Sequence, residues 1–206
     1  MCRLFLIALL SILPLPLTLG AASATVDGVE EDWVLVVTTP DPNITCPQIS
    51  TQMLLDSDPT SAVMVFNLNY REAPTFFAGG LQVKIQSGDQ VYATAYQGSA
   101  QLQTSNETIP WTQRLSLSNG TLSFKVNSGT STTWGNFGQG ETDLAVSIAS
   151  SRTSLSNYSP DASVTNSGAG FGANRVGSMT LLRVRYYQGQ TLLSTDSTPR
   201  MVNLSN

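Results

Sequence analysis

The chain has 206 residues, with 10 basic and 14 acidic side chains and a formal net charge of −4. It contains no histidine, which excludes histidine-based catalytic triads and metal sites with histidine ligands. The few basic residues do not form a run, so we do not expect binding to the phosphate backbone of a nucleic acid.

The first 24 residues have the composition of a cleaved signal peptide. Arg3 precedes an apolar run from Leu4 to Leu19, and Ala22-Ser23-Ala24 supplies the small residues that a signal peptidase requires. Pro14 and Pro16 interrupt the run, which suits a leader better than a membrane span of about 20 apolar residues. We expect cleavage after Ala24 and secretion, or export to the periplasm or cell envelope, and we do not expect an integral membrane protein.

Cleavage would leave 182 residues, a length that suits one domain. Arg3 and Cys2 leave with the leader, so the remaining chain has a net charge of −5 and one cysteine, Cys46. A lone cysteine in an exported protein is either buried or available for an intermolecular bond. Residues 25–32 end in three consecutive acids and are expected to form a flexible N-terminus, followed by a single domain over residues 33–206.

Alternation of apolar residues with period two predicts β-strands along this domain, and no segment shows sustained helical periodicity. Between Ala62 and Tyr70, apolar side chains occupy every second position, as in a strand with one buried face. Further strands are expected at Trp33–Thr38, Asp143–Ile148, Arg175–Tyr187 and Thr191–Ser194, with Gly189-Gln190 turning the last pair.

A hairpin is expected at Gly88-Asp89, because two alternating segments flank this pair of turn residues. A two-residue turn would place Ile85 opposite Tyr92. In the same register Leu81 would lie opposite Tyr96, so that apolar side chains share one face of the hairpin.

A second hairpin is expected at Asn119-Gly120, the residue pair that a type I′ turn prefers. The turn would pair Leu117 with Leu122 and Leu115 with Phe124. A slip of one residue would move these leucines to the opposite face, so the register is well determined.

About ten short strands joined by Gly, Asn and Ser turns predict an all-β sandwich or barrel. The polar segment 149–172 is long for a connection and is expected to pack as an ordered loop over one sheet.

Two groups of acids are candidates for catalytic or metal sites. Glu141-Thr142-Asp143 matches part of the Glu-x-Asp-x-x-Glu strand of jelly-roll glycanases, but Val146 replaces the third acid, which donates the proton. Asp56 and Asp58 match part of a calcium loop that no downstream residue completes, so a turn is favoured. We therefore expect no catalytic residue, no metal ligand and no cofactor, and calcium is supported by no complete motif.

Aromatic residues supply the candidate ligand contacts. Trp134 and Phe137 flank Asn136 in a loop bounded by glycines, where rings would stack on a sugar and the amide would bond its hydroxyls. Packing into the core is the alternative for both rings, and Trp33 is expected in the core. Arg183 and Arg185 occupy alternate positions on one strand and would either pair with carboxylates or form a patch.

The segment Asn166 to Leu181, with its Gly-rich turn and its Asn174-Arg175 pair, followed by Val184-Arg185-Tyr186-Tyr187, resembles the closing strands of laminin-G-like and concanavalin-like jelly rolls. The hairpin from Leu115 to Val126 is similar to their central back-sheet hairpin. Over roughly its last half the chain thus resembles uncharacterised exported proteins of environmental bacteria. The resemblance implies an antiparallel two-sheet sandwich, a jelly roll with a ligand groove on its concave face. Many such domains bind glycans, often with calcium, and some hydrolyse them.

We therefore expect an exported, non-enzymatic binding domain whose partner is a polysaccharide, a glycan or another extracellular polymer. Two alternatives stay open: a structural or assembly protein of the cell envelope without a small ligand, and a divergent glycoside hydrolase using Glu141 and Asp143. The expected ligand contacts are Trp134, Asn136, Phe137, Asn174 and Arg175.

Overall fold

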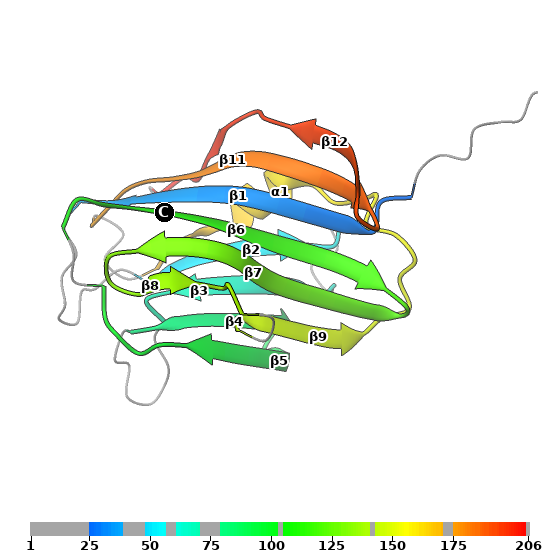
Figure 1. The fold of residues 1–206 in the computed structure, drawn as a ribbon, viewed down its shortest axis with the longest axis horizontal. Coiled ribbons are helices and arrows are strands. Elements are labelled where there is room, and N and C mark those ends of the chain that lie inside the picture. Colours follow the sequence, from blue (N-terminus) through cyan, green and yellow to red (C-terminus); the bar gives the residue numbers. More distant parts are fainter. Residues whose placement is uncertain are drawn as a thin grey trace, which may run out of the picture.

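A computed structural model describes residues 25–38, 48–56, 61–70, 79–102, 105–140, 143–170 and 175–204. Nearly all of the regular structure is antiparallel β-strand, arranged in two sheets that stack face to face (Figure 1). This arrangement confirms the expected all-β, two-sheet sandwich. Within the described ranges, no helix is long and apolar enough to cross a membrane.

The larger sheet has eight strands in the order β12-β11-β1-β6-β7-β8, with β13 paired to β11 and β9 paired to β7. Their bounds are β1 (Gly28–Val37), β6 (Glu107–Ser118), β7 (Thr121–Ser131), β8 (Gly135–Phe137), β9 (Ala145–Ala149), β11 (Val176–Gln188), β12 (Thr191–Asp196) and β13 (Arg200–Met201). The smaller sheet has the order β10-β2-β3-β4-β5. Its strands are β2 (Ile49–Leu54), β3 (Val63–Leu68), β4 (Leu81–Ser87), β5 (Gln90–Gln97) and β10 (Gly168–Ala169).

The ordered segment expected over residues 149–172 contains a short helix, α1 (Pro160–Asn166), which contacts β2. The helix begins where Ser159 accepts a hydrogen bond from the backbone N–H of Ala162, with Pro160 in the first turn. Ser167 at its end joins it to the smaller sheet, because its hydroxyl accepts a hydrogen bond from the backbone N–H of Gln52.

The expectation of a flexible N-terminus over residues 25–32 is wrong. Gly28 to Asp32 form the first half of β1, which pairs with β11 on one side and β6 on the other. Three consecutive acids are typical of a solvated chain end. Pairing on both edges places them in the middle of the sheet instead.

The hairpin at Asn119-Gly120 is confirmed. Leu117 pairs with Leu122 and Leu115 with Phe124, and Asn119 and Gly120 have the positive φ angles that a type I′ turn requires. All four apolar partners are buried in the core.

The hairpin at Gly88-Asp89 forms, but with a different register. A bulge after Ile85 moves its partner from Tyr92 to Ala93 and pairs Leu81 with Gln97. One extra residue on β5 turns the following side chains to the other face. Tyr92 and Tyr96 are therefore 55% and 51% exposed rather than part of the core.

The core lies between the two sheets. Its largest buried side chains are aromatic, and each stabilises the fold by an amount on the order of 2 kcal/mol through burial of apolar surface. Trp33 is 1% exposed, as expected. The four largest of the fully buried side chains are Trp33, Phe66, Phe124 and Phe137.

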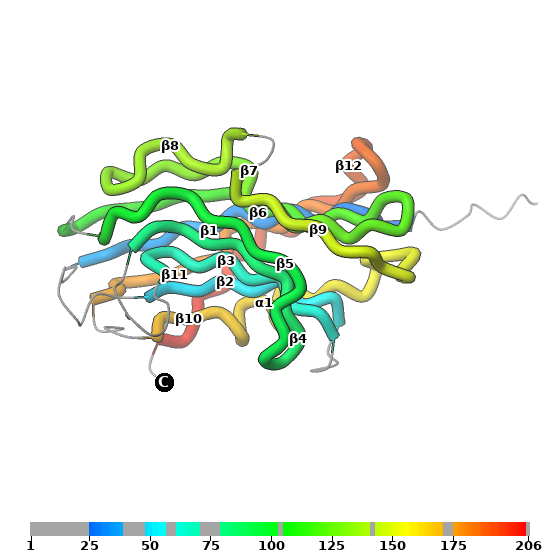
Figure 2. The backbone as a smooth tube through the Cα atoms, turned by 90° about the horizontal axis from the view of Figure 1, so that it is seen from below, coloured from blue at the N-terminus to red at the C-terminus, as the bar shows by residue number. Residues whose placement is uncertain are grey.

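The outer face of the larger sheet, which points away from the smaller sheet, is bordered on both sides. Figure 2 shows β8 and β12 rising on the same side of the strands between them. These two strands lie at opposite ends of the strand order. The outer face between them contains an open pocket.

Candidate ligand-binding groove

Strand β1 places two carboxylates on the outer face of the larger sheet. Because successive side chains of a strand point to opposite faces, Glu31, Trp33 and Leu35 enter the core, whereas Glu30 and Asp32 point outward. Their side chains are only 12% and 16% exposed, since residues of the neighbouring strands surround them.

The register of the sheet surrounds these carboxylates with basic residues. Glu30 lies opposite Arg185 on β11 and Arg114 on β6, and Asp32 lies opposite Arg183 on β11. Cross-strand pairs of opposite charge stabilise a sheet, so the pattern is favourable in itself. We refer to these five residues as the outer-face cluster: Glu30, Asp32, Arg114, Arg183 and Arg185.

Both carboxylate oxygens of Asp32 accept hydrogen bonds from neighbouring side chains. Arg183 lies with Nε 2.7 Å and Nη2 2.6 Å from Oδ2. Arg185 Nη2 and Thr112 Oγ1 each donate to Oδ1 at 2.8 Å. The carboxylate is thus held by charge-assisted hydrogen bonds from the strands on both sides.

Glu30 lies two residues before Asp32 on the same face of β1, and it is also surrounded by donors. Arg185 Nη2 pairs with its Oε1, and Asn127 Nδ2 donates to Oε2 at 3.1 Å. Arg114 Nη1 lies 3.6 Å from Oε2, with its guanidinium 4.5 Å from the centre of the Tyr187 ring. The cluster is therefore continuous, since Arg185 joins both carboxylates.

Two β-bulges lie beside the cluster. One, in β11 opposite the step from Asp32 to Trp33, adds Leu182. The other, in β7 opposite the step from Thr112 to Gln113, adds Asn127. Bulges reorient side chains and often occur next to binding sites, and here both bring an additional side chain to the outer face.

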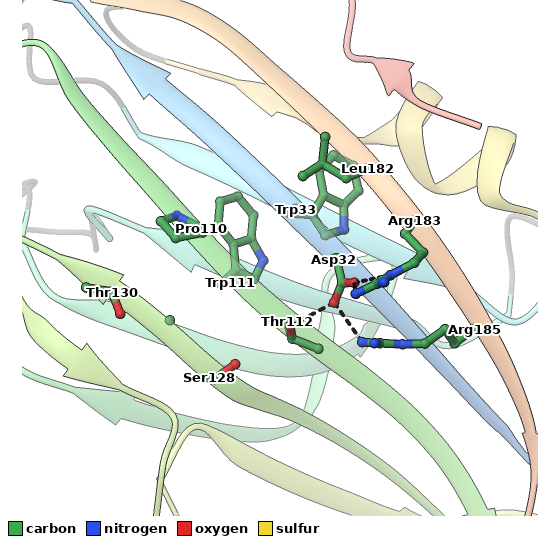
Figure 3. Close-up of a pocket in the computed structure, with 11 residues that line it drawn as sticks. Asp32, Trp33, Pro110, Trp111, Thr112, Ser128, Thr130, Leu182, Arg183 and Arg185 are labelled. Atoms are coloured by element: carbon green, nitrogen blue, oxygen red, sulfur yellow. Dashed lines mark hydrogen bonds and ion pairs between the residues drawn. The ribbon is translucent and has the colours of Figure 1, made fainter. Parts of the chain in front are cut away.

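An open pocket of about 410 Å³ lies on this face between β11 and β7 (Figure 3). Ser128 and Thr130 on β7 add hydroxyl groups at the side opposite the arginines. The polar lining comes mainly from Asp32, Arg183 and Arg185 of the cluster, together with Thr112. Pro110 on one side and Leu182 on the other supply apolar lining.

Trp33 and Trp111 also border the pocket, but their rings lie below it in the core. They are 1% and 2% exposed and stack in parallel, with centroids 6.1 Å apart and planes at 5°. A ligand in the pocket therefore meets their backbone and not the faces of their rings.

A second pocket of about 310 Å³ adjoins the first, since both are lined by Asp32, Leu182 and Arg183. It continues past β11 to Ser197, beyond the end of β12. Together the two pockets form a groove, which we call the outer-face groove, that crosses the four strands β7, β6, β1 and β11 and ends at Ser197. With strands about 4.8 Å apart, these four strands span roughly 14 Å, which suits an extended ligand.

The chemistry of the groove favours binding. General base catalysis requires a carboxylate with a free lone pair directed at substrate, whereas both oxygens of Asp32 already accept hydrogen bonds from three residues. The groove offers instead guanidinium N–H groups and hydroxyl groups held in fixed positions. No cluster of three or more residues suited to a metal ion occurs in the described ranges.

The two aromatic residues of the loop expected to bind ligand lie in different environments. Phe137 is fully buried and packs on Phe66 at 6.1 Å, so its assignment as a stacking contact is wrong. Gly129 leaves room for this ring, because a Cβ at Gly129 would lie 2.0 Å from Phe137. Trp134 is half-buried beside the core, with Nε1 donating to the Ala100 carbonyl at 2.8 Å, outside the groove.

Asn136 is the one expected contact that lies near the groove. It pairs with Thr130, whose hydroxyl donates to the Asn136 amide oxygen at 3.2 Å, and Thr130 lines the pocket. Arg175 lies away from both pockets, where its carbonyl accepts hydrogen bonds from Thr38. Asn174 lies outside the described residues.

Several other sequence expectations also fall outside the described residues. They concern the leader, Cys46 and the acids Asp58 and Glu141. Asp143, the second acid of the hydrolase alternative, is exposed just before β9. Asp56 pairs with Arg152 and accepts a hydrogen bond from Ser61.

The pairing of Arg183 and Arg185 with carboxylates was one of two alternatives that the sequence left open. The acids themselves were missed as their partners. A signal was present in the alternation of this strand. If Trp33 and Leu35 point into the core, then Glu30 and Asp32 point to the opposite face. The two acids are two residues apart, and so are Arg183 and Arg185 on their own strand.

A separate polar network lies inside the sandwich around Glu31, which is fully buried. Trp33 Nε1 and Gln113 Nε2 each donate to its Oε2 at 2.8 Å, and the Tyr158 hydroxyl donates to Oε1. Thr51 Oγ1 on β2 donates to the Gln113 amide oxygen at 2.8 Å, so the network joins the two sheets. Burial raises the pKa of Glu31, and the hydrogen bonds from the surrounding side chains oppose this shift only in part.

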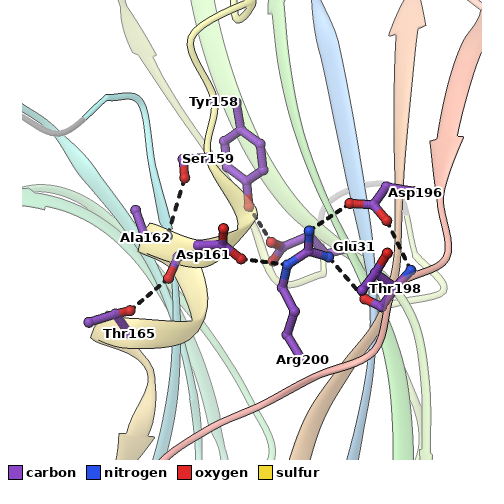
Figure 4. A network of polar contacts seen from close by, with 9 residues as sticks. All are labelled: Glu31, Tyr158, Ser159, Asp161, Ala162, Thr165, Asp196, Thr198 and Arg200. Atoms are coloured by element: carbon purple, nitrogen blue, oxygen red, sulfur yellow. Dashed lines mark hydrogen bonds and ion pairs between the residues drawn. The ribbon is translucent and has the colours of Figure 1, made fainter.

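Outside this network, Arg200 forms ion pairs with Asp161 at the start of α1 and with Asp196 at the end of β12 (Figure 4). Hydrogen bonds from Thr198 and Arg200 lower the pKa of Asp196 to about 2. These contacts attach the C-terminal strands to the helix, and neither Arg200 nor its two acidic partners line the groove.

The fold and the groove define an antiparallel β-sandwich with an elongated polar groove on its larger sheet. No family model matches the chain, and no curated protein matches its sequence. Among solved structures, it is similar to the crystal structure of scytalido-glutamic peptidase with a peptide-based transition state analogue, at 11% identity and a TM-score of 0.34. The alignment covers 85% of this chain and 82% of that one. A likeness of this strength assigns no activity.

Proposed function

We propose that the protein is a non-enzymatic binding domain whose ligand is a polysaccharide lying across the strands in the outer-face groove. The observation that supports it is the groove itself, which crosses four strands and combines fixed polar groups with apolar borders. Sugar polymers present hydroxyl oxygens around an apolar ring face. Guanidinium and hydroxyl donors suit the oxygens, and Pro110 and Leu182 suit the ring faces.

The rigidity of the donors supports binding over catalysis. Each guanidinium of the outer-face cluster is positioned by at least one carboxylate before any ligand arrives. A preorganised side chain loses less conformational entropy when it binds, which favours affinity. The same contacts occupy the carboxylates that a hydrolase would need.

Export belongs to the same proposal, because an extracellular polymer requires an extracellular protein. Cleavage after Ala24 would leave three residues before β1, which begins at Gly28. N-terminal sequencing of the protein released from cells should give Thr25 as the first residue. Retention of the leader on the mature protein would contradict export by this route.

Binding can be tested by affinity gel electrophoresis in gels containing xylan, galactomannan, pullulan or polygalacturonate. Ser128→Tyr should fill the groove and abolish the retardation that a bound polymer causes. Ser123→Tyr is the matched control, because Ser123 lies on the outer face of the same strand and lines neither pocket. The proposal fails if none of these polymers retards the wild-type protein, or if the two variants behave alike.

A further inference from the structure

The outer-face cluster has more positive than negative charge. Three guanidinium groups share two carboxylates, which leaves one positive charge in excess. Lys125 lies opposite Arg114 on β7 and adds another. Asp27, an acid just before β1, is not one of the carboxylates that pair with these arginines, because it accepts a hydrogen bond from the backbone N–H of Gly189. This local excess stands against a chain whose net charge is −4.

Hydrogen-bond acceptors in the cluster are used, whereas donors are left over. Asp32 accepts from three residues, and Glu30 accepts from Arg185 and Asn127 with Arg114 nearby. Each guanidinium has five N–H donors, and the ion pairs of Arg183 use only Nε and Nη2.

The two arginines that line the pocket are the source of the spare donors. The Arg183 side chain is 46% exposed, so its free edge is open to the groove. The Arg185 side chain is 21% exposed and contacts the carboxylates through Nη2, whereas its Nε is buried and has no hydrogen-bond partner among the described residues. A complementary ligand group therefore has several acceptor oxygens, few donors and a negative charge.

We propose that the groove selects an acidic polysaccharide, whose carboxylate or sulfate groups bind to Arg183 and Arg185 while the sugar rings lie along Pro110 and Leu182. This inference rests on the proposed function and specifies its ligand. Arginine suits the task because its planar fork bonds two oxygens of one anionic group. A neutral polymer would occupy the same groove without neutralising its charge.

The test compares polygalacturonate with its fully methyl-esterified form, which has the same backbone and no charge. Titration calorimetry should show binding to the acidic form at least about tenfold tighter, the effect of one charge-assisted contact. Sulfated dextran against dextran provides the same comparison for sulfate and distinguishes the two anionic groups. An equal affinity for the acidic and neutral forms would overturn the selectivity and leave polysaccharide binding intact.

Variants locate the selectivity. Arg183→Gln should reduce the preference for the acidic form to a few-fold and leave the affinity for the esterified form nearly unchanged. Arg152→Gln is the control, because it removes one positive charge from a side chain that lies outside the groove and pairs with Asp56. Equal effects of the two variants would contradict a role for the groove, and so would equally tight binding of a DNA duplex.

Discussion

Arg183 and Asp32 lie opposite each other on β11 and β1, and the guanidinium approaches one carboxylate oxygen with both Nε and Nη2, at 2.7 and 2.6 Å. The carboxylate also accepts hydrogen bonds from Thr112 on β6 and from Arg185. Asp32 therefore joins three adjacent strands on the outer face and fixes the positions of two arginines that line the groove.

Replacing this carboxylate should weaken the sheet. Asp32→Asn keeps the shape of the side chain but removes the charge that three donors share. We expect a loss of about 1 to 2 kcal/mol in the free energy of unfolding, since the pair is largely shielded from solvent but not fully buried. Urea denaturation measures the change. Asp89→Asn, at the exposed tip of a turn, is the control, and an equal loss in both variants would contradict the role of Asp32.

Stability should depend on pH through Glu31. Because burial raises its pKa, the folded protein binds this proton more tightly than the unfolded chain does. The stabilisation is complete below the ordinary pKa of 4.5 and is lost as the pH rises through the higher folded value. Tyr158, Tyr186 and the Arg200 ion pairs lie nearby, so a comparison with a neutral variant is needed to isolate Glu31.

Glu31→Gln provides that comparison, because the amide has the same shape and does not titrate. From pH 4.5 upward, the wild-type protein should lose stability relative to the variant by at most about 1.4 kcal/mol per pH unit, the limit for one proton. Urea denaturation between pH 4 and pH 7 measures both proteins. A difference that stays constant over this range would show that Glu31 is not the titrating group.

Gly129 should tolerate no side chain. An added Cβ would lie 2.0 Å from the ring of Phe137, which is fixed in the core and contacts Phe66. Gly129→Ala should therefore lower the free energy of unfolding by about 1 to 3 kcal/mol through overpacking. Gly168→Ala is the matched control, because a Cβ there meets nothing within 4 Å. Unchanged thermal stability in Gly129→Ala would mean that the ring can move aside.

Trp134 should affect stability and not binding. Trp134→Phe keeps an aromatic ring against the core but removes the hydrogen bond from Nε1 to the Ala100 carbonyl. We expect a loss of about 1 kcal/mol in the free energy of unfolding, with the retardation in polysaccharide gels unchanged. A stable variant that no longer binds polymer would return the ligand site to the loop around Trp134.

Local sequence signals predicted the parts of the fold that depend on neighbouring residues. The Asn119-Gly120 turn and its register follow from positive φ angles and alternating leucines a few residues apart. The hairpin at Gly88-Asp89 formed with another register, because a bulge after Ile85 leaves no mark in the alternation of apolar residues. The burial of Phe137 was equally hidden, since it depends on the space that Gly129 leaves on the next strand.

The sequence by itself determined the all-β class, the positions of most strands and the presence of arginines at alternate positions. Only the tertiary structure decided where the groove lies. Asp32 and Arg183 are 151 residues apart in the chain, and they meet because β1 pairs with β11 in one register. Periodicity tells which face a side chain occupies within its own strand. It does not tell which strand lies alongside, because that choice depends on packing of the whole core.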